Sequence, residues 1–329
     1  MRRVRPIKAV FRETWRVISR FCARAAVTGL SWACGLLSWS AAVALGRNAG
    51  RVAFVLPSQA RRRTLAHLRS AYHGAKSDAK LREIARRNFE HFGMSLAEIF
   101  KFQGDPSVSE HVFFEGEAHL KAALSFGKGV ILVTGHVGNW ELLGAALARW
   151  GYPLHVVATP LRDTRMDAGL LALRSRLRVQ TIHRGTERAA QKIRGALRGK
   201  EILTFLIDQD IKAKGVFVDF FGKEAHTPTG AARLAQRSGA AVVCAFIQRL
   251  SDGRHRITID PPMFLTRTHD LSSDIARHTA TLTARIEAQV RDAPEQWVWM
   301  HRRWKTQTGV AQKAAPVFAP MPGNAPSRA

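Results

Sequence analysis

The sequence predicts an α/β fold, because short apolar segments rich in β-branched residues alternate with helical segments from about residue 130 onward. Hydrophobic residues make up 46% of the 329 residues, which is enough for a full core and argues against global disorder. A charge-free run over residues 25–46 adds an N-terminal helix that is long enough to span a bilayer. These observations predict an α/β domain that follows a membrane-anchoring or transmembrane helix.

The N-terminal 24 residues are basic, with eight Lys and Arg residues against the single acid Glu13. The run 25–46 that follows is only moderately hydrophobic, because Ala, Ser and Gly are frequent in it. Such a segment either spans a bilayer or lies in its interface as an anchor, and a buried core helix is the alternative. Basic residues flank both ends, so the positive-inside rule does not choose an orientation.

The chain carries a net charge of +26, with 51 Lys and Arg residues against 25 Asp and Glu residues. This imbalance predicts an anionic partner, which is nucleic acid, an anionic membrane surface, or an acidic protein or substrate. The basic residues border an apolar anchor, which favours the membrane surface over nucleic acid. Three scattered cysteines and the absence of zinc-ligand spacing indicate neither a disulfide framework nor a metal site.

The elements after the anchor follow from hydrophobic periodicity. A helix is expected over 78–103, with Asn88, Glu90 and His91 on its exposed or cleft-facing side. Strands are expected over 130–133, 154–158, 179–182, 202–207, 241–247 and 256–260. Helices are expected over 142–150, 167–177, 189–197, 231–238 and 271–291, with a strand or loop over 216–222. The tail 309–329 is rich in Ala, Pro and Gly and is expected to be disordered.

The turn between strand 130–133 and helix 142–150 carries the main candidate site. Side chains five positions apart on an ideal helix point about 140° apart. His136 therefore has to lie in the turn, and Glu141 in the first helical turn, if the two are to touch. A carboxylate on one imidazole nitrogen fixes the tautomer and leaves the other nitrogen free as a base. The same pair could instead only cap a helix, and the motif alone does not decide between the two.

A second candidate lies where strand 202–207 ends in Asp208-Gln209-Asp210. Acidic residues at the end of a buried strand are typical of a functional edge, although an Asx-turn or a helix cap is the alternative.

These motifs, taken in order, resemble the lipid A biosynthesis acyltransferases, the late lauroyl/myristoyl transferases within the wider glycerolipid acyltransferase-like class. The resemblance covers most of the chain, and only the ordered set is specific. It rests on the segment Gly127 to Glu141, Arg61-Arg62-Arg63 with Leu68, Arg86-Arg87-Asn88-Phe89 with Phe92-Gly93, Asp208-Gln209-Asp210, Phe220-Phe221-Gly222, Thr227-Pro228-Thr229-Gly230, Pro294 to Trp297, and His301 to Lys305.

The resemblance implies a mixed, mostly parallel sheet flanked by helices. It also implies an enzyme at the inner membrane, with its catalytic domain on the cytoplasmic side. The reaction would move an acyl chain from acyl carrier protein to a hydroxyl of a lipid A precursor, an anionic glycolipid. The acyl thioester would be a co-substrate, and neither a cofactor nor a metal would be needed. The implied organisation is a basic segment (1–24), the anchor (25–46), an acyltransferase domain (47–308) and the tail (309–329).

In this reading His136 is the general base and Glu141 orients it. Backbone N–H groups of the turn, including that of Gly138, would stabilise the oxyanion with help from Asn139. An activated thioester needs no covalent enzyme intermediate, which fits the absence of a Gly-x-Ser-x-Gly elbow.

Four further residues are expected to bind substrate. Arg174 falls where the family carries an arginine and would bind an acceptor phosphate or carboxylate, with Arg176 as the alternative in register. Asp208 and Asp210 match the acidic motif of the family and would hold Arg174 or a sugar hydroxyl.

Two alternatives stay open. The same fold could use another acceptor, such as a phosphatidylinositol mannoside or a lysolipid, or acyl-CoA as the donor. A non-catalytic basic protein that binds membrane or nucleic acid is the interpretation from another class.

Overall fold

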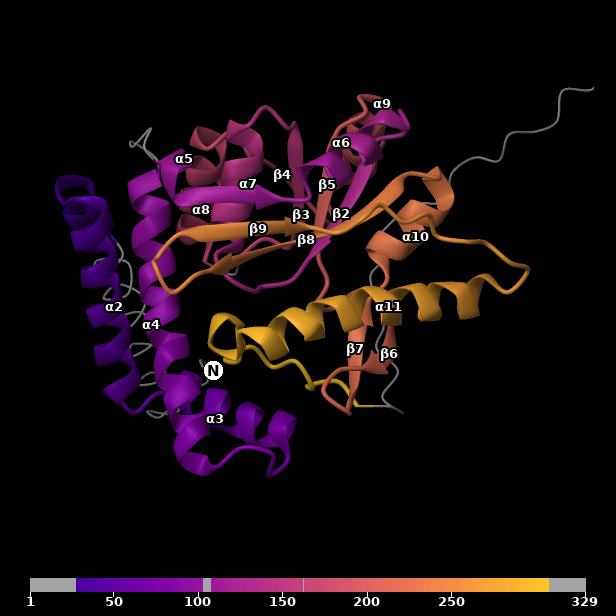
Figure 1. Ribbon diagram of the computed structural model, residues 1–329. Helices are drawn as coiled ribbons and strands as arrows, with labels where there is room; N and C mark the ends of the chain where they lie inside the picture. The colour runs from indigo at the N-terminus through magenta and orange to yellow at the C-terminus, as the bar shows by residue number, and fades with distance from the viewer. Residues whose placement is uncertain (1–27, 103–107, 162, 308–329) are drawn as a thin grey trace, which may run out of the picture.

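The computed structural model describes residues 28–102, 108–161 and 163–307 (Figure 1). The predicted basic segment 1–24, the start of the predicted anchor and the predicted tail 309–329 lie outside these described residues.

A seven-stranded sheet forms the centre of the molecule, in the strand order β1-β9-β8-β2-β5-β3-β4. The strands from β8 to β4 run parallel, whereas β9 is antiparallel to β8 and parallel to β1. The strands are β1 (Val112–Glu115), β2 (Val130–Thr134), β3 (Leu154–Ala158), β4 (Gln180–His183), β5 (Ile202–Leu206), β8 (Ala241–Arg249) and β9 (His255–Ile259). The prediction of a mixed, mostly parallel sheet is confirmed. A separate antiparallel hairpin consists of β6 (Gly215–Asp219) and β7 (Glu224–Pro228).

Helices cover both faces of the sheet, which explains why β2 is buried throughout and apolar at every position except its last, Thr134. Ile131 and Val133 of β2 belong to a core with α9, α10 and α11, whereas Val130 and Leu132 belong to a second core with α6 and α7. The helices are α2 (Trp39–Val55), α3 (Gln59–Tyr72), α4 (Asp78–Phe102), α5 (Val108–His111), α6 (Glu117–Ser125), α7 (Trp140–Arg149), α8 (Thr164–Arg176), α9 (Ala189–Arg198), α10 (Gly230–Ser238) and α11 (Leu271–Asp292), followed by the 3₁₀ turn η1 (Pro294–Gln296).

The predicted anchor helix 25–46 needs correction. Residues 28–36 are helical, but the helix stops there, and α2 begins after Ser38, whose hydroxyl caps it by accepting from the backbone N–H of Ala41. Within the described residues, no helix is both long and apolar enough to cross a membrane. The predicted boundary between residues 46 and 47 falls inside α2.

The small residues that lower the hydropathy of this region serve helix packing. α2 runs along α4 (Figure 1), and a Cβ added to Gly46 would lie 2.3 Å from the carbonyl oxygen of Gly93. Glycine is therefore required for the two backbones to approach so closely. At the same crossing, Arg51 forms an ion pair with Glu90 at 2.8 Å.

Three polar residues of α4 are buried, although the sequence placed them on an exposed or cleft-facing side. Asn88, Glu90 and His91 have relative exposures of 0%, 7% and 2%. The amide of Asn88 donates to the carbonyl oxygens of Glu295 and Trp297, at 2.8 and 2.6 Å. Polar side chains on the inner side of α4 thus hold the segment around η1. The sequence also did not predict α3, α6 and β1, and it had the segment 216–222 as a strand or loop, where the structure has β6.

Candidate active site

The turn from β2 to α7 is held tightly by its neighbours. Gly138 adopts a positive φ of 63°, and a Cβ there would lie 1.7 Å from the carbonyl oxygen of Ile247, so only glycine fits. The N–H of Gly138 donates to the carbonyl oxygen of Gln296 at 2.9 Å. The turn is therefore fixed against β8 on one side and η1 on the other.

His136 in this turn pairs with Asp208, which follows the neighbouring strand β5. Imidazole Nδ1 lies 2.7 Å from Oδ1 of Asp208, and the backbone N–H of His136 donates to Oδ2 at 2.7 Å. The indole N–H of Trp297 also donates to Oδ2, at 2.8 Å. The carboxylate is fully buried, whereas the side chain of His136 keeps 19% of its exposure. Asp208 therefore orients both the ring and the backbone of His136.

The ionisation of Asp208 sets the tautomer of His136. Burial alone would raise the pKa of Asp208, but the attraction of His136 and the hydrogen bonds from His136 and Trp297 lower this pKa to about 2. An ionised carboxylate only accepts, so Nδ1 of the imidazole carries the proton. Nε2 then has the free lone pair that a general base needs. The ring also packs edge-on against Trp140, with centroids 4.9 Å apart.

Glu141 has a different partner from the one that the sequence predicted. Its Oε2 accepts from Nε of Arg174 at 2.9 Å, and its Oε1 accepts from Nη2 at 2.5 Å. Both carboxylate oxygens thus bind one guanidinium, which ties the first turn of α7 to α8. The expected orienting contact with His136 is made by Asp208 instead. Arg174, expected to bind an acceptor anion or Asp208, is buried against Glu141.

Arg176 is not equivalent to Arg174 in the structure. It lies on the exposed side of α8, because two residues correspond to a rotation of about 200° on a helix. Only Arg174 faces the turn that holds the histidine.

Asn139, expected to help an oxyanion, uses its side chain to hold the turn. Its Oδ1 caps α7 by accepting from the N–H of Leu142 at 3.2 Å, and its Nδ2 donates to Glu98 at 2.9 Å and to the carbonyl oxygen of Ser95 at 3.1 Å. The N–H of Gly138 is likewise engaged with Gln296. Both predicted donors thus hold the turn in place, and neither is directed at a position that an oxyanion could occupy.

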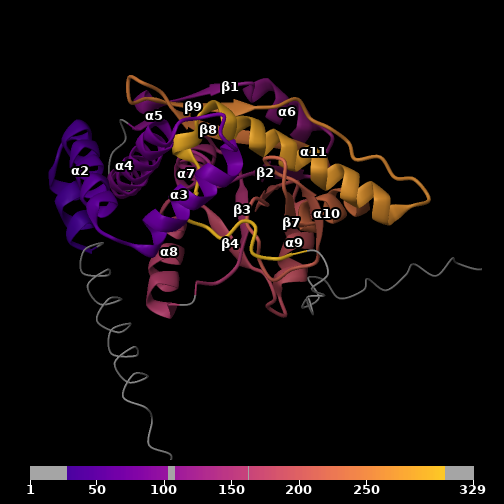
Figure 2. The ribbon, with the colours of Figure 1, turned by 90° about the horizontal axis from the view of Figure 1, so that it is seen from below.

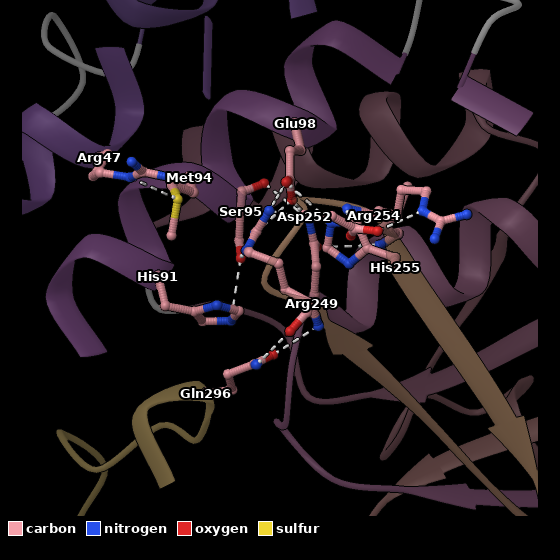
Figure 3. A network of polar contacts seen from close by, with 12 residues as sticks. Arg47, His91, Met94, Ser95, Glu98, Arg249, Asp252, Arg254, His255 and Gln296 are labelled. Atoms are coloured by element: carbon pink, nitrogen blue, oxygen red, sulfur yellow. Dashed lines mark hydrogen bonds and ion pairs between the residues drawn. The ribbon is translucent and has the colours of Figure 1, made fainter. Parts of the chain in front are cut away.

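A buried polar network that the sequence did not predict lies behind this turn (Figure 3). Glu98 of α4 accepts from Arg249 at 2.7 Å and contacts Nε2 of His255 at 3.0 Å. Gln296 exchanges two hydrogen bonds of 2.9 Å with the backbone of Arg249. A glutamate among the apolar residues of a core helix was the available signal, because a buried carboxylate needs partners. The network connects α4, β8, β9 and η1 to the candidate site.

Asp210 holds the C-terminal segment. Its two carboxylate oxygens accept from the backbone N–H and the hydroxyl of Thr306, at 2.7 and 2.9 Å, and Lys305 lies 3.6 Å away. Asp210 therefore has a structural role, and Arg174, which it was expected to hold, pairs with Glu141.

His301 is a further histidine whose charge state depends on the candidate site. Burial is the main reason that its pKa falls to about 4; Asp208 acts in the opposite direction, and His136 adds to the decrease. His301 is therefore neutral near pH 7 and adds no positive charge beside His136. The sequence indicated it only as part of a motif.

A narrow cavity opens beneath α7, beside the Glu141–Arg174 pair. Its volume is about 20 Å³, which is room for about one water molecule. Apart from this pair, the lining is largely apolar and includes Trp140, Leu143, Gly144, Leu147, Val156 and Val179. Within the described part of the chain, no group of three or more His, Cys, Asp or Glu side chains is arranged to hold a metal ion.

Comparison with known proteins identifies relatives of this chain. The model of the family described as bacterial lipid A biosynthesis acyltransferase matches residues 9–306. A lipid A biosynthesis palmitoleoyltransferase of Escherichia coli (strain K12) is 30% identical over 285 residues, which cover 85% of this chain and 90% of that protein. A lipid A biosynthesis lauroyltransferase of the same strain is 28% identical over 70% of this chain and 74% of that protein. A phosphatidylinositol mannoside acyltransferase of Mycobacterium tuberculosis (strain ATCC 25618 / H37Rv) is 26% identical over 69% of this chain and 72% of that protein.

Proposed function

Since the chain belongs to the bacterial lipid A biosynthesis acyltransferase family and is an acyltransferase, we propose that it transfers a fatty acyl chain from a thioester to a hydroxyl of a lipid A precursor. Acyl carrier protein is the proposed donor, and the acceptor is an anionic glycolipid. The observation that carries the proposal is the His136–Asp208 pair at the edge between β2 and β5, within a chain that matches this family over residues 9–306.

The proposed reaction uses His136 as the general base. Nε2 of His136 takes the proton of the acceptor hydroxyl while the oxygen attacks the thioester carbonyl carbon. The ionised Asp208 stabilises the imidazolium that forms. The C–O bond forms, the C–S bond breaks, and the proton then passes from the imidazolium to the thiolate that leaves. The enzyme forms no covalent bond with the acyl group, because the thioester is already activated.

The oxyanion is assigned to the N-terminus of α7 in this proposal. The ring contact between His136 and Trp140 brings the first residue of α7 beside the imidazole. The N–H groups of a first helical turn have no partners within the helix, and the helix dipole places positive charge there. We assign to the Glu141–Arg174 pair the task of fixing this helix end against α8.

Membrane association is also proposed. Five large apolar side chains are exposed along helix 28–36 and the end of α2, with relative exposures of 57% to 72%: Trp32, Leu36, Val52, Val55 and Leu56. Apolar surface of this kind favours burial in the interface of a bilayer, with basic residues beside it to attract anionic lipid. The inner membrane, with the enzyme on its cytoplasmic side, is the proposed location.

An in vitro assay tests the proposal. Purified enzyme is given a lipid A precursor together with acyl carrier protein or coenzyme A that bears the same acyl group, and the products are weighed by mass spectrometry. The proposal expects an added acyl chain in an ester that depends on His136. An unmodified precursor with both donors, under conditions where the protein is folded, would contradict it.

A second acceptor is favoured by one observation. The mycobacterial relative named as a phosphatidylinositol mannoside acyltransferase covers 69% of this chain. The same assay with a phosphatidylinositol mannoside as acceptor decides between the two glycolipids.

A further inference from the structure

A second and much larger cavity lies between α9, α10 and the beginning of α11, with a volume of about 570 Å³. Its floor is apolar, with Ile193 and Leu197 from α9 and Leu234 from α10. Its rim is basic, with Arg194, Arg198, Arg233, Arg237 and Arg267. We refer to this feature as the arginine groove.

The arginines of the groove keep their charge without a carboxylate partner among the described residues. Within the described residues, none of the five forms an ion pair with a carboxylate, whereas Arg174 and Arg249 are both paired. Arg233 donates from Nε to the hydroxyl of Thr229 at 3.0 Å, which orients it without reducing its charge. Like charges gathered around an apolar floor repel one another, and an anionic partner with apolar side chains relieves that repulsion.

The position of the arginine groove favours a soluble partner over the bilayer. The exposed apolar side chains of α2 and the helix before it belong to one end of the molecule, whereas α9 and α10 lie across the sheet from that end in both views (Figures 1 and 2). When the α2 end rests on a membrane, the helices α9 and α10 that line the groove lie away from the lipid. It stays open to a protein that arrives from solution.

We propose that the arginine groove docks an acidic, amphipathic helix of the carrier protein that delivers the acyl thioester; this inference rests on the proposed function. A helix that places apolar residues on the floor and carboxylates against the rim fits the helix-in-groove mode of recognition. The helix α11 extends from the arginine groove to the candidate active site. Ile275 lines the groove, whereas Ile286 lies under Gly135, beside His136. These eleven residues correspond to about 16 Å along the helix axis, which the flexible arm bearing the thioester has to cover.

The test compares two donors that carry the same acyl group, one on acyl carrier protein and one on pantetheine alone. The variant Arg194→Glu/Arg237→Glu reverses two exposed charges on the rim. The matched control Arg62→Glu/Arg82→Glu makes the same charge change on exposed positions of α3 and α4. The measured quantity is kcat/KM for the carrier-protein donor divided by kcat/KM for the pantetheine donor.

The proposal expects this ratio to fall about tenfold or more in the groove variant, because two attractions to carboxylates of the partner become repulsions, and to stay near the wild-type value in the control. Equal losses with both donors, or an equal fall in the control, would overturn it. So would a groove variant that keeps the ratio but no longer sediments with vesicles of anionic lipid, because the groove would then bind membrane.

Failure of the proposed function gives a different result, since the wild type would then use neither donor. A wild-type enzyme that accepts acyl-pantetheine but not acyl carrier protein overturns the docking inference and the proposed donor, whereas the proposed acyl transfer to the glycolipid stands. The neutral variant Arg194→Gln/Arg237→Gln covers the case in which charge reversal disturbs folding, and it is expected to lower the ratio in the same direction.

Discussion

At the residue scale, the structure assigns two carboxylates to two different tasks. Asp208 contacts the imidazole of His136, and Glu141 contacts Arg174. Both acids lie near the same turn, yet only Asp208 touches the proposed base. Substitutions of Asp208 and of Glu141 should therefore affect acyl transfer in different ways, which kinetic measurements can distinguish.

We predict that Asp208→Asn lowers kcat far more than Glu141→Gln. An asparagine at 208 can donate to Nδ1 and so favours the wrong tautomer, a change that costs on the order of 10⁴-fold in a comparable histidine–aspartate pair. Glu141→Gln weakens the link between α7 and α8 and is expected to cost on the order of 10²-fold through misplacement of the helix end. The measurement is steady-state acyl transfer by folded protein, with His136→Ala as the reference for complete loss. A larger loss in Glu141→Gln would return the orienting role to Glu141.

The lowered pKa of Asp208 predicts a pH-dependent contribution to stability. Its folded-state pKa is about 2, whereas an unperturbed aspartate titrates near 3.9. The contribution, on the order of 2 kcal/mol, is therefore fully present above the unfolded pKa and is lost as the pH falls from about 4 through 2. Urea unfolding of wild type and Asp208→Asn should differ most at pH 6 to 7, and the difference should shrink at pH 3. A difference that does not change over this range would contradict the assignment.

At the scale of elements, the sequence predicted most strands and helices but not which of them are neighbours. The apolar run 130–133 and the alanine-rich helix after it were evident from periodicity, and they are β2 and the body of α7. That β5 lies beside β2, and so brings Asp208 to His136, is decided by sheet order, which local pattern does not contain. The predicted pair of His136 with Glu141 followed from nearness in sequence. A contact between residues 72 positions apart replaces it.

The prediction of one continuous helix over 25–46 failed for a related reason. The prediction rested on a charge-free run in the sequence. The small residues in this run pack against α4, and this contact is visible only in the structure. Ser38 caps a new helix, and Gly46 lies against the backbone of α4.

We predict that Gly46→Ala destabilises the protein by about 1–3 kcal/mol, because its Cβ overlaps the carbonyl oxygen of Gly93 and forces α2 and α4 apart. Gly35→Ala is the matched control. It also lies in a helix, but a Cβ there meets nothing within 4 Å, so the change is expected to be neutral or to stabilise by about 0.5–1 kcal/mol. Thermal unfolding of both variants, carried out in one detergent, measures their change in stability. Equal effects of the two substitutions would show that the α2–α4 contact does not require glycine at position 46.

At the scale of the whole molecule, we propose that the net charge of +26 serves surfaces with different partners. The overall charge predicted an anionic partner but not where it binds, since composition carries no position. In the structure, five large exposed apolar side chains lie at the α2 end, and arginines that form no ion pair within the described residues surround an apolar groove away from it. We therefore propose that the enzyme faces the lipid with the α2 end while a soluble donor binds at the groove.

This division predicts which apolar residues control membrane binding. In Leu36→Ser/Val55→Ser/Leu56→Ser, three exposed side chains lose most of their favourable transfer into the interface, so vesicle binding by the full-length protein should weaken by on the order of 10²-fold. Phe264→Ser is the control, because this exposed aromatic packs on Phe126 outside the α2 end. Sedimentation with vesicles of anionic lipid gives the bound fraction, and circular dichroism checks the fold. If Phe264→Ser reduced binding as strongly as the triple substitution, the membrane would contact the molecule away from α2, and the orientation that leaves the arginine groove open to a carrier protein would be wrong.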